Sequence, residues 1–331
     1  MEMSSNDLVT IIIPTINRLQ WIERSLEFYN KKKFKHPIFI GDSSNLKNFN
    51  LLKKKVNKYK NVQVSLFHLP NLTAEQVIYN LSKLVNTNYS TFLADDDIIF
   101  PKFFDLSVKH LSKDKNLIGV TGKGYCYSLE GNRLKGKIIS FGDYPIIDAQ
   151  EENFYERILS NFNSNFACVF TIVRTSIFTE AFSKVNKLNQ YHQTFILGEL
   201  QCAIEYLKKG KIKKLNVPFI IRQQHHQNNY GNRSLNKWLI NDFHSSYKII
   251  NNNLQNLKIS KIKRNILNNK FDEFLTISIN KMCEKESNIS SKYKKKITLK
   301  FNLKFFLIKL FFTCNLKYKE LLLVFRYLSK C

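Results

Sequence analysis

Apolar runs alternate with amphipathic stretches over the first 100 residues, and this alternation is the strongest constraint on the fold. Four short runs are expected to be strands: LVTIIIP, HPIFIGD, NVQVSLFHL and YSTFLADDD. Between them, apolar residues recur at spacings of three and four, as Leu19, Ile22, Leu26 and Tyr29 do, which is typical of an amphipathic helix. Because strand and helix alternate about every 25 to 30 residues, the sequence predicts an α/β fold with a doubly wound sheet.

Three of the predicted strands are followed by polar clusters, PTINR, GDSS and ADDD. In open α/β sheets, ligands bind beyond the carboxyl ends of the strands. We therefore expect these clusters to lie at one edge of the sheet and to form a binding site there.

The section from residue 120 to residue 235 has a less regular pattern. GVTGKGYCYSL, KIISF and FACVFTIV resemble strands, and residues 198–208 are expected to form a helix that ends at Gly210. KIKKLNVPFIIRQQHH then predicts a final strand followed by an exposed polar turn. We expect one domain over residues 1–235, with a nucleotide-binding half at 1–110 and an acceptor half at 111–235.

The pattern changes again from residue 236, where apolar residues repeat by threes and fours. The repeat contains Ile240, Phe243, Tyr247, Ile250, Leu254 and Leu257, and residues 262–282 continue it. Since 331 residues exceed the usual size of one domain, we predict a separate, helical and basic region over residues 236–331.

The charge of the chain is strongly positive and uneven. There are 52 Lys and Arg against 26 Asp and Glu, a net charge of +26. Residues 236–331 hold 20 basic and 6 acidic residues, a net +14 that leaves +12 for the first 235 residues. A polyanionic neighbour, such as nucleic acid, a membrane surface or a phosphorylated substrate, would explain this charge. The alternative is an A/T-rich coding sequence that favours lysine.

The segment ITLKFNLKFFLIKLFF in the basic region has two interpretations. It alternates like a strand up to Phe305 and is then almost continuously apolar, with Lys304 and Lys309 interrupting it. It is either an interfacial segment attracted to anionic lipid or a packed amphipathic element that covers the main domain. No run reaches the roughly 18 to 20 apolar residues that cross a bilayer.

The six cysteines are scattered without a C-x-x-C pair, so neither a zinc site nor a redox motif is indicated. Together with a start that lacks a signal-peptide pattern, this predicts a cytoplasmic protein. If the tail binds lipid, the protein lies peripherally at the inner face of the cell membrane.

Asp95, Asp96 and Asp97 are consecutive acids in a basic chain. Adjacent carboxylates repel one another, so they persist near a strand end only when they are solvated or neutralised by a cation. A hard divalent ion such as Mg²⁺ or Mn²⁺ meets that need, with the phosphate oxygens of a ligand completing its coordination shell. A solvated acidic turn is the alternative.

In order and spacing, VTIIIPTINR, IGDSS and FLADDDIIFP together resemble the nucleotide-binding half of family 2 glycosyltransferases, which have the GT-A fold. The resemblance is strong over residues 8–110 and weaker over residues 190–230. It implies that Pro14, Thr15 and Arg18 border a nucleoside pocket.

The same resemblance gives roles to the acids. It implies that Asp42 hydrogen-bonds the base, usually uracil, that Asp95 is the ribose-side acid and that Asp96 binds the metal. Asp97 is either a further metal ligand or a residue that shapes the turn. Ala94 stands where many relatives have the first acid of an Asp-x-Asp-Asp pattern, which leaves the register open by one residue.

A candidate catalytic base comes from the segment LGELQCAIEYLKKGKI. Many relatives carry Glu-Asp before a glycine, and counting eleven residues back from Gly210 reaches Glu199, with Gly198 at the position of the first acid. The resemblance implies that Glu199 deprotonates the acceptor hydroxyl. The alternative is an acidic residue near a helix start that the helix dipole favours.

The segment IIRQQHHQN stands where relatives often have a polar loop over the diphosphate. Arg222, His225 and His226 are therefore candidate contacts to phosphate or metal. The alternative for the two histidines is a solvated turn.

These observations favour an inverting, Mn²⁺- or Mg²⁺-dependent glycosyltransferase, in keeping with cell-surface polysaccharide synthesis. Its donor is expected to be a nucleotide-diphosphate sugar, of the UDP type, and its acceptor a hydroxyl of a glycan or a lipid-linked glycan. A nucleic-acid-binding protein is the second hypothesis, but it leaves the three aspartates without a role, so no nucleic-acid partner is expected. A nucleotidyltransferase is the third, and the absence of glycine from PTINRLQ argues against it.

Overall fold

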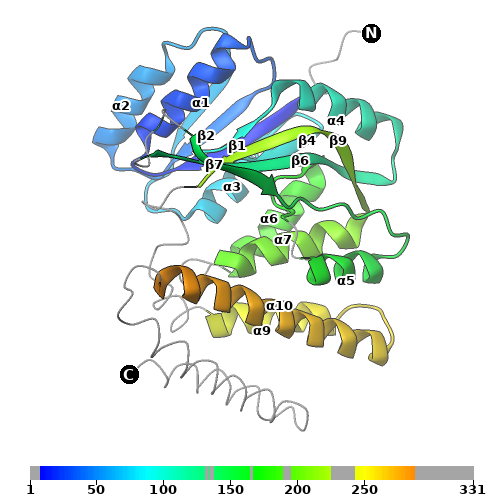
Figure 1. The fold of residues 1–331 in the computed structure, drawn as a ribbon. Helices are drawn as coiled ribbons and strands as arrows, with labels where there is room; N and C mark the ends of the chain where they lie inside the picture. Colours follow the sequence, from blue (N-terminus) through cyan, green and yellow to red (C-terminus); the bar gives the residue numbers. More distant parts are fainter. Residues whose placement is uncertain are drawn as a thin grey trace.

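A nine-stranded sheet forms the centre of the part of the chain that the computed structural model describes, which is residues 8–130, 134, 138–164, 167–188, 195–224 and 243–287 (Figure 1). The strands are β1 (Val9–Thr15), β2 (Ile38–Asp42), β3 (Val64–His68), β4 (Tyr89–Phe92), β5 (Ile98–Ile99), β6 (Leu117–Leu129), β7 (Ile138–Tyr144), β8 (Ile172–Arg174) and β9 (Lys211–Gln223). Their order is β3-β2-β1-β4-β8-β6-β9-β5, and β7 pairs with β6.

Helices cover both faces of this sheet. They are α1 (Leu19–Lys31), α2 (Leu46–Val56), α3 (Ala74–Ser82), α4 (Pro101–Lys113), α5 (Phe154–Ser164), α6 (Thr175–Leu188), α7 (Phe195–Lys209), α9 (Phe243–Gln255) and α10 (Lys261–Ser287). Figure 1 shows α1, α2 and α4 above the sheet and α3, α5, α6 and α7 below it. The predicted fold class, a doubly wound α/β fold with a mixed sheet, is confirmed.

The first half of the chain folds as its pattern predicts. β1, β2, β3 and β4 pair in parallel, and β1, the inner strand, is an almost fully buried apolar run. The apolar stripe of α1, which includes Ile22 and Leu26, is buried against the sheet. Side-chain caps begin the next two helices: Asn45 accepts a hydrogen bond from the backbone of Asn48, and Thr73 forms a capping box with Gln76.

From residue 101 onward the chain contains three helices that the pattern did not predict, α4, α5 and α6. Pro101 stands in the first turn of α4, where its missing N–H costs no hydrogen bond. Of the strand-like FACVFTIV, only residues from Ile172 onward form a strand, and that strand pairs antiparallel with β4 and β6. The predicted strands at KIISF and KIKKLNVPFIIRQ and the helix that ends before Gly210 are confirmed.

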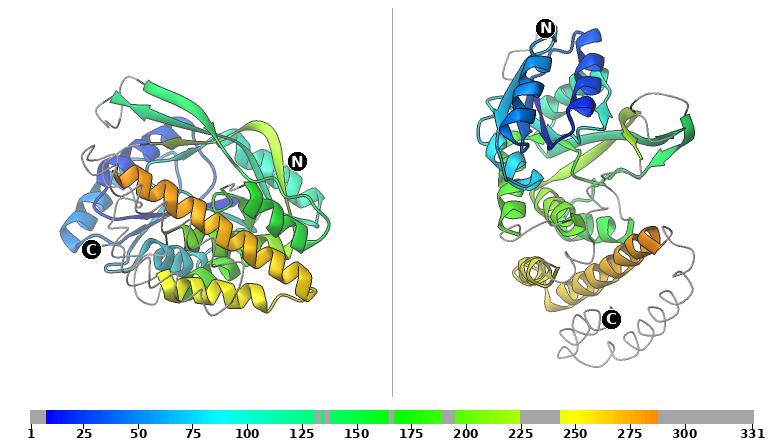
Figure 2. Two further views of the ribbon diagram at one scale, coloured as in Figure 1. Left: turned by 60° about the horizontal axis from the view of Figure 1, so that its bottom comes forward. Right: turned by 90° about the vertical axis from the view of Figure 1, so that its left-hand side faces the viewer.

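The helical prediction for the tail is confirmed over residues 243–287. Phe162 of α5 lies 6.0 Å, between ring centroids, from Phe271 of α10, and Asn253 of α9 donates a hydrogen bond to Gln201 of α7. Figure 2 shows α9 and α10 side by side across the α5 and α7 side of the molecule. In the described residues, no helix has the length and apolar character that a membrane span requires. The predicted boundary near residue 235 and the segment ITLKFNLKFFLIKLFF lie outside the described residues.

Candidate functional site

The ends of three parallel strands bring the predicted polar clusters to one edge of the sheet. Pro14 pairs with Gly41 and Thr15 with Asp42 across β1 and β2, and Asp42 pairs in turn with His68 of β3. On the other side of β1, Ile12 pairs with the last residue of β4, and the acids follow directly. The three clusters therefore meet where the sequence predicted.

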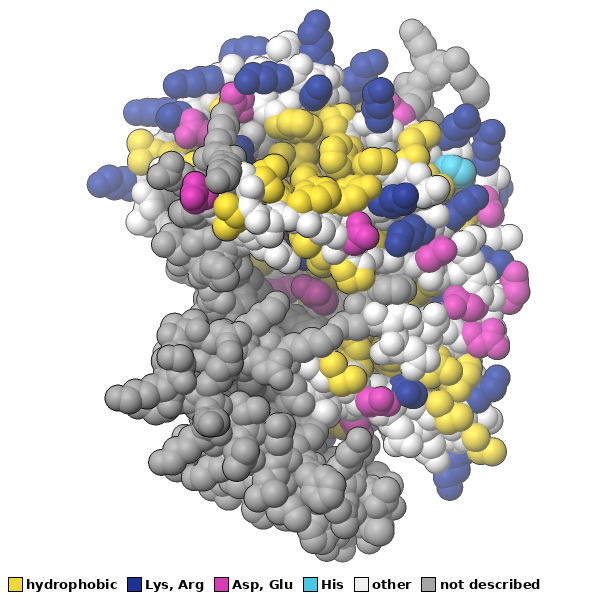
Figure 3. Space-filling view, viewed as in Figure 1, with side chains coloured by type: hydrophobic (Ala, Val, Ile, Leu, Met, Phe, Trp, Pro, Cys, Tyr) yellow, Lys and Arg dark blue, Asp and Glu magenta, His cyan; other side chains and the backbone are white. Residues whose placement is uncertain are grey.

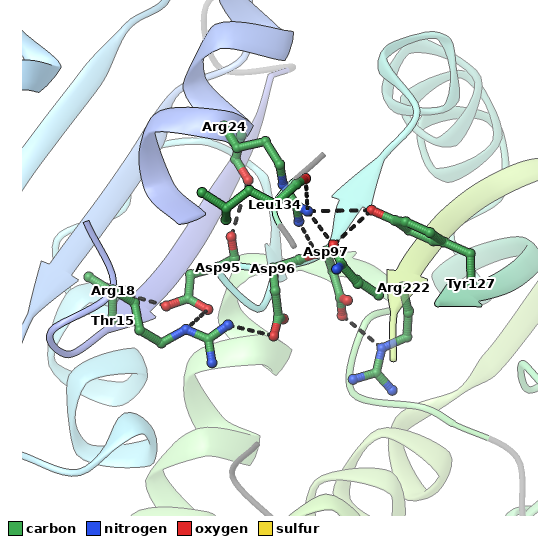
Figure 4. Close-up of polar contacts among 11 residues, drawn as sticks. Thr15, Arg18, Arg24, Asp95, Asp96, Asp97, Tyr127, Leu134 and Arg222 are labelled. Atoms are coloured by element: carbon green, nitrogen blue, oxygen red, sulfur yellow. Dashed lines mark hydrogen bonds and ion pairs between the residues drawn. The ribbon is translucent and has the colours of Figure 1, made fainter. Parts of the chain in front are cut away.

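Asp95 is buried against β1. Its Oδ2 accepts a hydrogen bond from the Thr15 hydroxyl at 2.7 Å, and its Oδ1 lies 3.1 Å from Arg18 Nε (Figure 4). Burial is the largest effect on the pKa of Asp95 and, together with the neighbouring charge of Asp96, raises it to about 7, although Arg18 lowers it. Asp95, which lies beside Thr15 and Arg18, is therefore a much weaker acid than an exposed aspartate.

Asp96 shares the same arginine. Arg18 Nη2 donates to Asp96 Oδ2 at 2.7 Å, and the Asp96 side chain keeps 13% of its surface exposed. Its backbone carbonyl accepts a hydrogen bond of 2.6 Å from Arg24 Nη2. The carboxylate therefore remains reachable from solvent, while its backbone is fixed from behind.

Asp97 turns to the other side of the acidic turn, where Arg222 binds it. Arg222 Nε donates to Asp97 Oδ2 at 2.7 Å, and Figure 4 shows Arg18 and Arg222 on opposite sides of the turn. The guanidinium of Arg222 lies over the rings of Tyr144 and Phe170, at 4.7 and 4.6 Å from their centroids. Burial is the largest cause that raises the pKa of Asp97, to about 6, and attraction to Arg222 opposes it.

The acidic turn therefore already has cationic partners within the chain. Arg18 neutralises Asp95 and Asp96, and Arg222 neutralises Asp97. The folded protein can therefore tolerate three adjacent acids, because three charge-assisted contacts from two arginines replace much of the lost hydration.

The donor atoms of the turn also fit a hard divalent cation. Among the residues that the structure describes, no group of three or more His, Cys, Asp and Glu side chains is arranged to hold a metal. Mg²⁺, however, is commonly held by only one or two carboxylates, with phosphate oxygens completing the shell. Asp96 is partly exposed, and Asp97 Oδ1 is buried without a hydrogen-bond partner in the described chain. These oxygen donors suit Mn²⁺ or Mg²⁺.

A small pocket opens beside Asp42. Its volume is about 130 Å³, which is less than pockets that enclose a drug-sized ligand, so it can take only part of a nucleotide. Asp42 Oδ1 accepts hydrogen bonds from the backbone N–H and the hydroxyl of Ser44. The residues that line the pocket are Thr15, Asn17, Arg18, Leu19, Asp42, Ser44, Asn48, Leu51 and Leu52.

Glu199 lies in the first half of α7, on the Arg222 side of the site. Its side chain is exposed, yet protein atoms around the carboxyl group raise its pKa by desolvation, and the nearby charge of Glu75 adds to this. Attraction to Arg222 acts in the opposite direction.

Several residues of the site were missed by sequence reasoning. Arg24 is buried and donates to the Asp96 carbonyl. The guanidinium groups of Arg18 and Arg24 lie 4.9 and 4.6 Å from the ring centroid of Trp21. The spacing of three that puts Arg18, Trp21 and Arg24 on one helical face was the available signal. Tyr144, which accepts a 2.6 Å hydrogen bond from Arg222, had no such signal. The predicted contacts His225 and His226 lie outside the described residues.

Comparison with known proteins gives structural matches only. No protein-family model matches the sequence, and no curated protein matches it either. The crystal structure of S. aureus TarS 1–349 superimposes with a TM-score of 0.56 at 14% identity, covering 87% of this chain and 77% of that chain. The complex of TarS 1–349 with UDP-GlcNAc gives 0.55 at 15% identity, covering 81% and 71%.

A longer TarS structure matches with a TM-score of 0.51 at 15% identity and covers 81% of this chain, which spans only 43% of that chain. Similarity at these identities establishes the fold. The GT-A fold that the sequence motifs led us to expect is confirmed by these structures.

Proposed function

We propose that this chain is a glycosyltransferase that moves a sugar from a nucleotide-diphosphate donor, a UDP-sugar, to a hydroxyl of a glycan or lipid-linked glycan. The observation that carries the proposal is the meeting of Thr15, Arg18, Asp42 and the acidic turn at one edge of the sheet. The TarS complexes with UDP-GlcNAc and UDP, which share this fold, support the choice of donor.

The nucleoside half of the donor binds at the pocket beside β1 and β2. Pro14, Thr15 and Arg18 border it, Asp42 hydrogen-bonds the base, and Asp95 accepts a hydrogen bond from the ribose. The small pocket volume supports this division, since only a part of the nucleotide enters it and the diphosphate extends toward the acidic turn.

Asp96 and Asp97 would hold Mn²⁺ or Mg²⁺, which when bound neutralises charge on the departing diphosphate. Arg222 adds positive charge at the same side of the turn, and it also keeps Asp97 in place. His225 and His226 are further proposed contacts to phosphate or metal.

Glu199 accepts the proton of the acceptor hydroxyl. As that oxygen forms a bond to the anomeric carbon, the bond from this carbon to the diphosphate breaks, and the configuration at the carbon inverts. The raised pKa of Glu199 supports the assignment, because a more basic carboxylate is a better proton acceptor near neutral pH. The acceptor belongs to cell-surface polysaccharide synthesis at the cytoplasmic side of the membrane, where residues 236–331 contribute affinity for anionic lipid.

A thermal-shift screen tests this proposal. A ligand that binds only the native state raises the melting temperature, so UDP and UDP-sugars should stabilise the protein, more strongly with Mn²⁺ than without it. GDP, ADP and CDP with their sugars serve as controls for the base. A protein that responds to none of these ligands, or to single-stranded nucleic acid instead, is not the transferase proposed here.

A further inference from the structure

Charge is concentrated in a short part of the nucleotide-binding half. Residues 31–60 contain ten lysines and one acid, Asp42, a net +9 within 30 residues of a chain whose whole charge is +26. No arginine occurs in this range. The excess is about twice as dense as the net +14 in the 96 residues of the C-terminal region, and it lies at the ends of α1 and α2 and in the loops that follow them.

The fold gathers nine of these lysines on one surface. β1, β2 and β3 are parallel, so α1 and α2 run back between them and end at the edge where the strands begin. Asn30 Oδ1 accepts a 2.8 Å hydrogen bond from the backbone N–H of Asn61, which ties the end of α1 to the chain after α2. The lysine surface consists of Lys31, Lys32, Lys33, Lys35, Lys53, Lys54, Lys55, Lys58 and Lys60.

Most of this charge is uncompensated. Lys31 pairs with Glu27 at 2.7 Å and Lys55 with Glu23 at 2.8 Å. The other seven lysines are exposed and have no ion pair with any described residue. Figure 3 shows basic side chains crowded along the upper rim of the molecule, over the region that α1, α2 and α4 form.

Helix stability explains only part of this pattern. Cations in the last turn of a helix interact favourably with its dipole, which accounts for Lys31 in α1 and Lys53 to Lys55 in α2. The effect falls off beyond the last turn, so it does not account for Lys33, Lys35, Lys58 and Lys60. The proposed donor does not account for them either, because its pocket lies at the opposite edge of the sheet.

We propose that the lysine surface docks the protein on a bilayer that contains anionic phospholipid. Lysine is a hydrated point charge on a flexible stem, suited to a diffuse layer of anionic headgroups. Proteins that bind single-stranded nucleic acid add exposed aromatic rings on which bases stack. Here Phe34 is buried and Tyr59 is partly buried, with its hydroxyl bonded to the Glu23 carbonyl, so the surface offers charge without stacking rings.

The lysine surface is separate from the residues that carry out the proposed reaction. Because the strands begin at the lysine surface and end at the acidic turn, docking leaves the candidate site facing away from the lipid. It also assigns a role to α1 and α2 that is separate from any contribution of residues 236–331.

Vesicle sedimentation of the full chain tests the proposal. We compare neutral phosphatidylcholine vesicles with vesicles that contain about 30% phosphatidylglycerol, at low and high salt. The test variant replaces Lys32, Lys35, Lys54 and Lys58 by Gln. The control variant makes the same change in charge outside both the lysine surface and residues 236–331, at four exposed lysines after α3 and in β6, α6 and α7: Lys83, Lys123, Lys187 and Lys209→Gln.

The wild type should bind only the anionic vesicles and be released by salt. Since each lysine near an anionic surface contributes roughly fivefold in affinity, the test variant should bind at least about tenfold more weakly, while the control should change much less. Equal losses in the two variants, or no loss in the test variant, would overturn the proposal. Binding to a single-stranded oligonucleotide without binding to anionic vesicles would overturn it as well.

Discussion

Arg24 donates a 2.6 Å hydrogen bond from Nη2 to the backbone carbonyl of Asp96, the residue proposed as metal ligand. Its Nη1 bonds to Gln223 at the end of β9 and to the carbonyl of Leu134. One buried guanidinium on α1 thus joins the acidic turn to the end of a distant strand. The position of the Asp96 carboxylate depends on this helix as well as on the strand that leads into the turn.

Replacing Arg24 should therefore disturb the site without touching its carboxylates. Arg24→Met leaves buried acceptors without a donor and should lower the free energy of unfolding by about 2 to 4 kcal/mol, as measured by urea denaturation. It should also weaken UDP binding in the presence of Mn²⁺. Arg157→Met is the matched control, because Arg157 is equally buried and donates to the carbonyls of Leu207 and Glu151 away from the site. A similar loss of UDP affinity in both variants would mean that Arg24 affects UDP binding only through the stability of the fold.

The ion pair between Arg222 and Asp97 should show strong coupling. Removing Arg222 leaves a buried carboxylate unpaired, so Arg222→Gln should cost about 3 to 5 kcal/mol of unfolding free energy. The double variant Asp97→Asn with Arg222→Gln should be less destabilised than the sum of the single variants. The exposed pair Lys270 and Glu273 provides the control, with a coupling below about 1 kcal/mol. If the losses of unfolding free energy in the two single variants simply added up in the double variant, the account would be contradicted.

The raised pKa values of Asp95 and Asp97 predict how stability depends on pH. In the metal-free protein these groups titrate near 7 and 6, above their values in the unfolded chain, so the folded state binds more protons. Their contribution to stability is fully present below the pKa of an aspartate in the unfolded chain and is lost as the pH rises through about 4 to 7. His36, whose pKa burial lowers, acts in the opposite direction below its ordinary pKa.

Comparing the wild type with the variant Asp95→Asn isolates the effect of the Asp95 carboxyl group on stability. The difference in unfolding free energy between wild type and Asp95→Asn cancels the contribution of His36. Wild type should lose stability relative to the variant as the pH rises from about 4 to 7. A difference that is constant over this range would show that Asp95 is not strongly perturbed.

Glu199→Gln should separate binding from chemistry. Because the amide keeps the size of the side chain but cannot accept the proton, the variant should bind UDP as the wild type does. Its transfer rate in single-turnover measurements should fall by at least about a hundredfold, in line with the loss of a general base. Glu180→Gln, in the exposed part of α6, should leave both quantities unchanged. Normal transfer by Glu199→Gln would assign the base to another residue.

Local patterns in the sequence were sufficient to predict most strands and helices of the nucleotide-binding half. β1 and β2 are mainly apolar and buried, and the helices between the strands have apolar stripes, so burial and periodicity agree in that region. The placement of Thr15, Asp42 and the acids at one edge followed from the rule that parallel strands end together. The helix α4, which begins at the end of that half, and the helices α5 and α6 after it were not predicted from their sequence pattern.

The partners of the acids could not be predicted in the same way. Asp97 meets Arg222, 125 residues away, and Arg24 meets Gln223, 199 residues away. No periodicity links such positions, since their contact depends on β6 and β9 pairing in parallel beside the acidic turn. Sequence reasoning therefore identified the acids but explained how the chain tolerates them by a metal or by solvation, whereas the structure adds two arginines from the chain itself.

Calorimetric titration of UDP into wild type and Asp96→Asn, each with and without Mn²⁺, tests the central claim most directly. The account predicts that Mn²⁺ tightens UDP binding by at least about tenfold in the wild type and has little effect in the variant, since a ligand to the metal is lost. Asn17→Ala serves as a control that changes the pocket rim but not the acidic turn. Absence of UDP binding by the wild type, or an equal effect of Mn²⁺ in wild type and Asp96→Asn, would contradict the account.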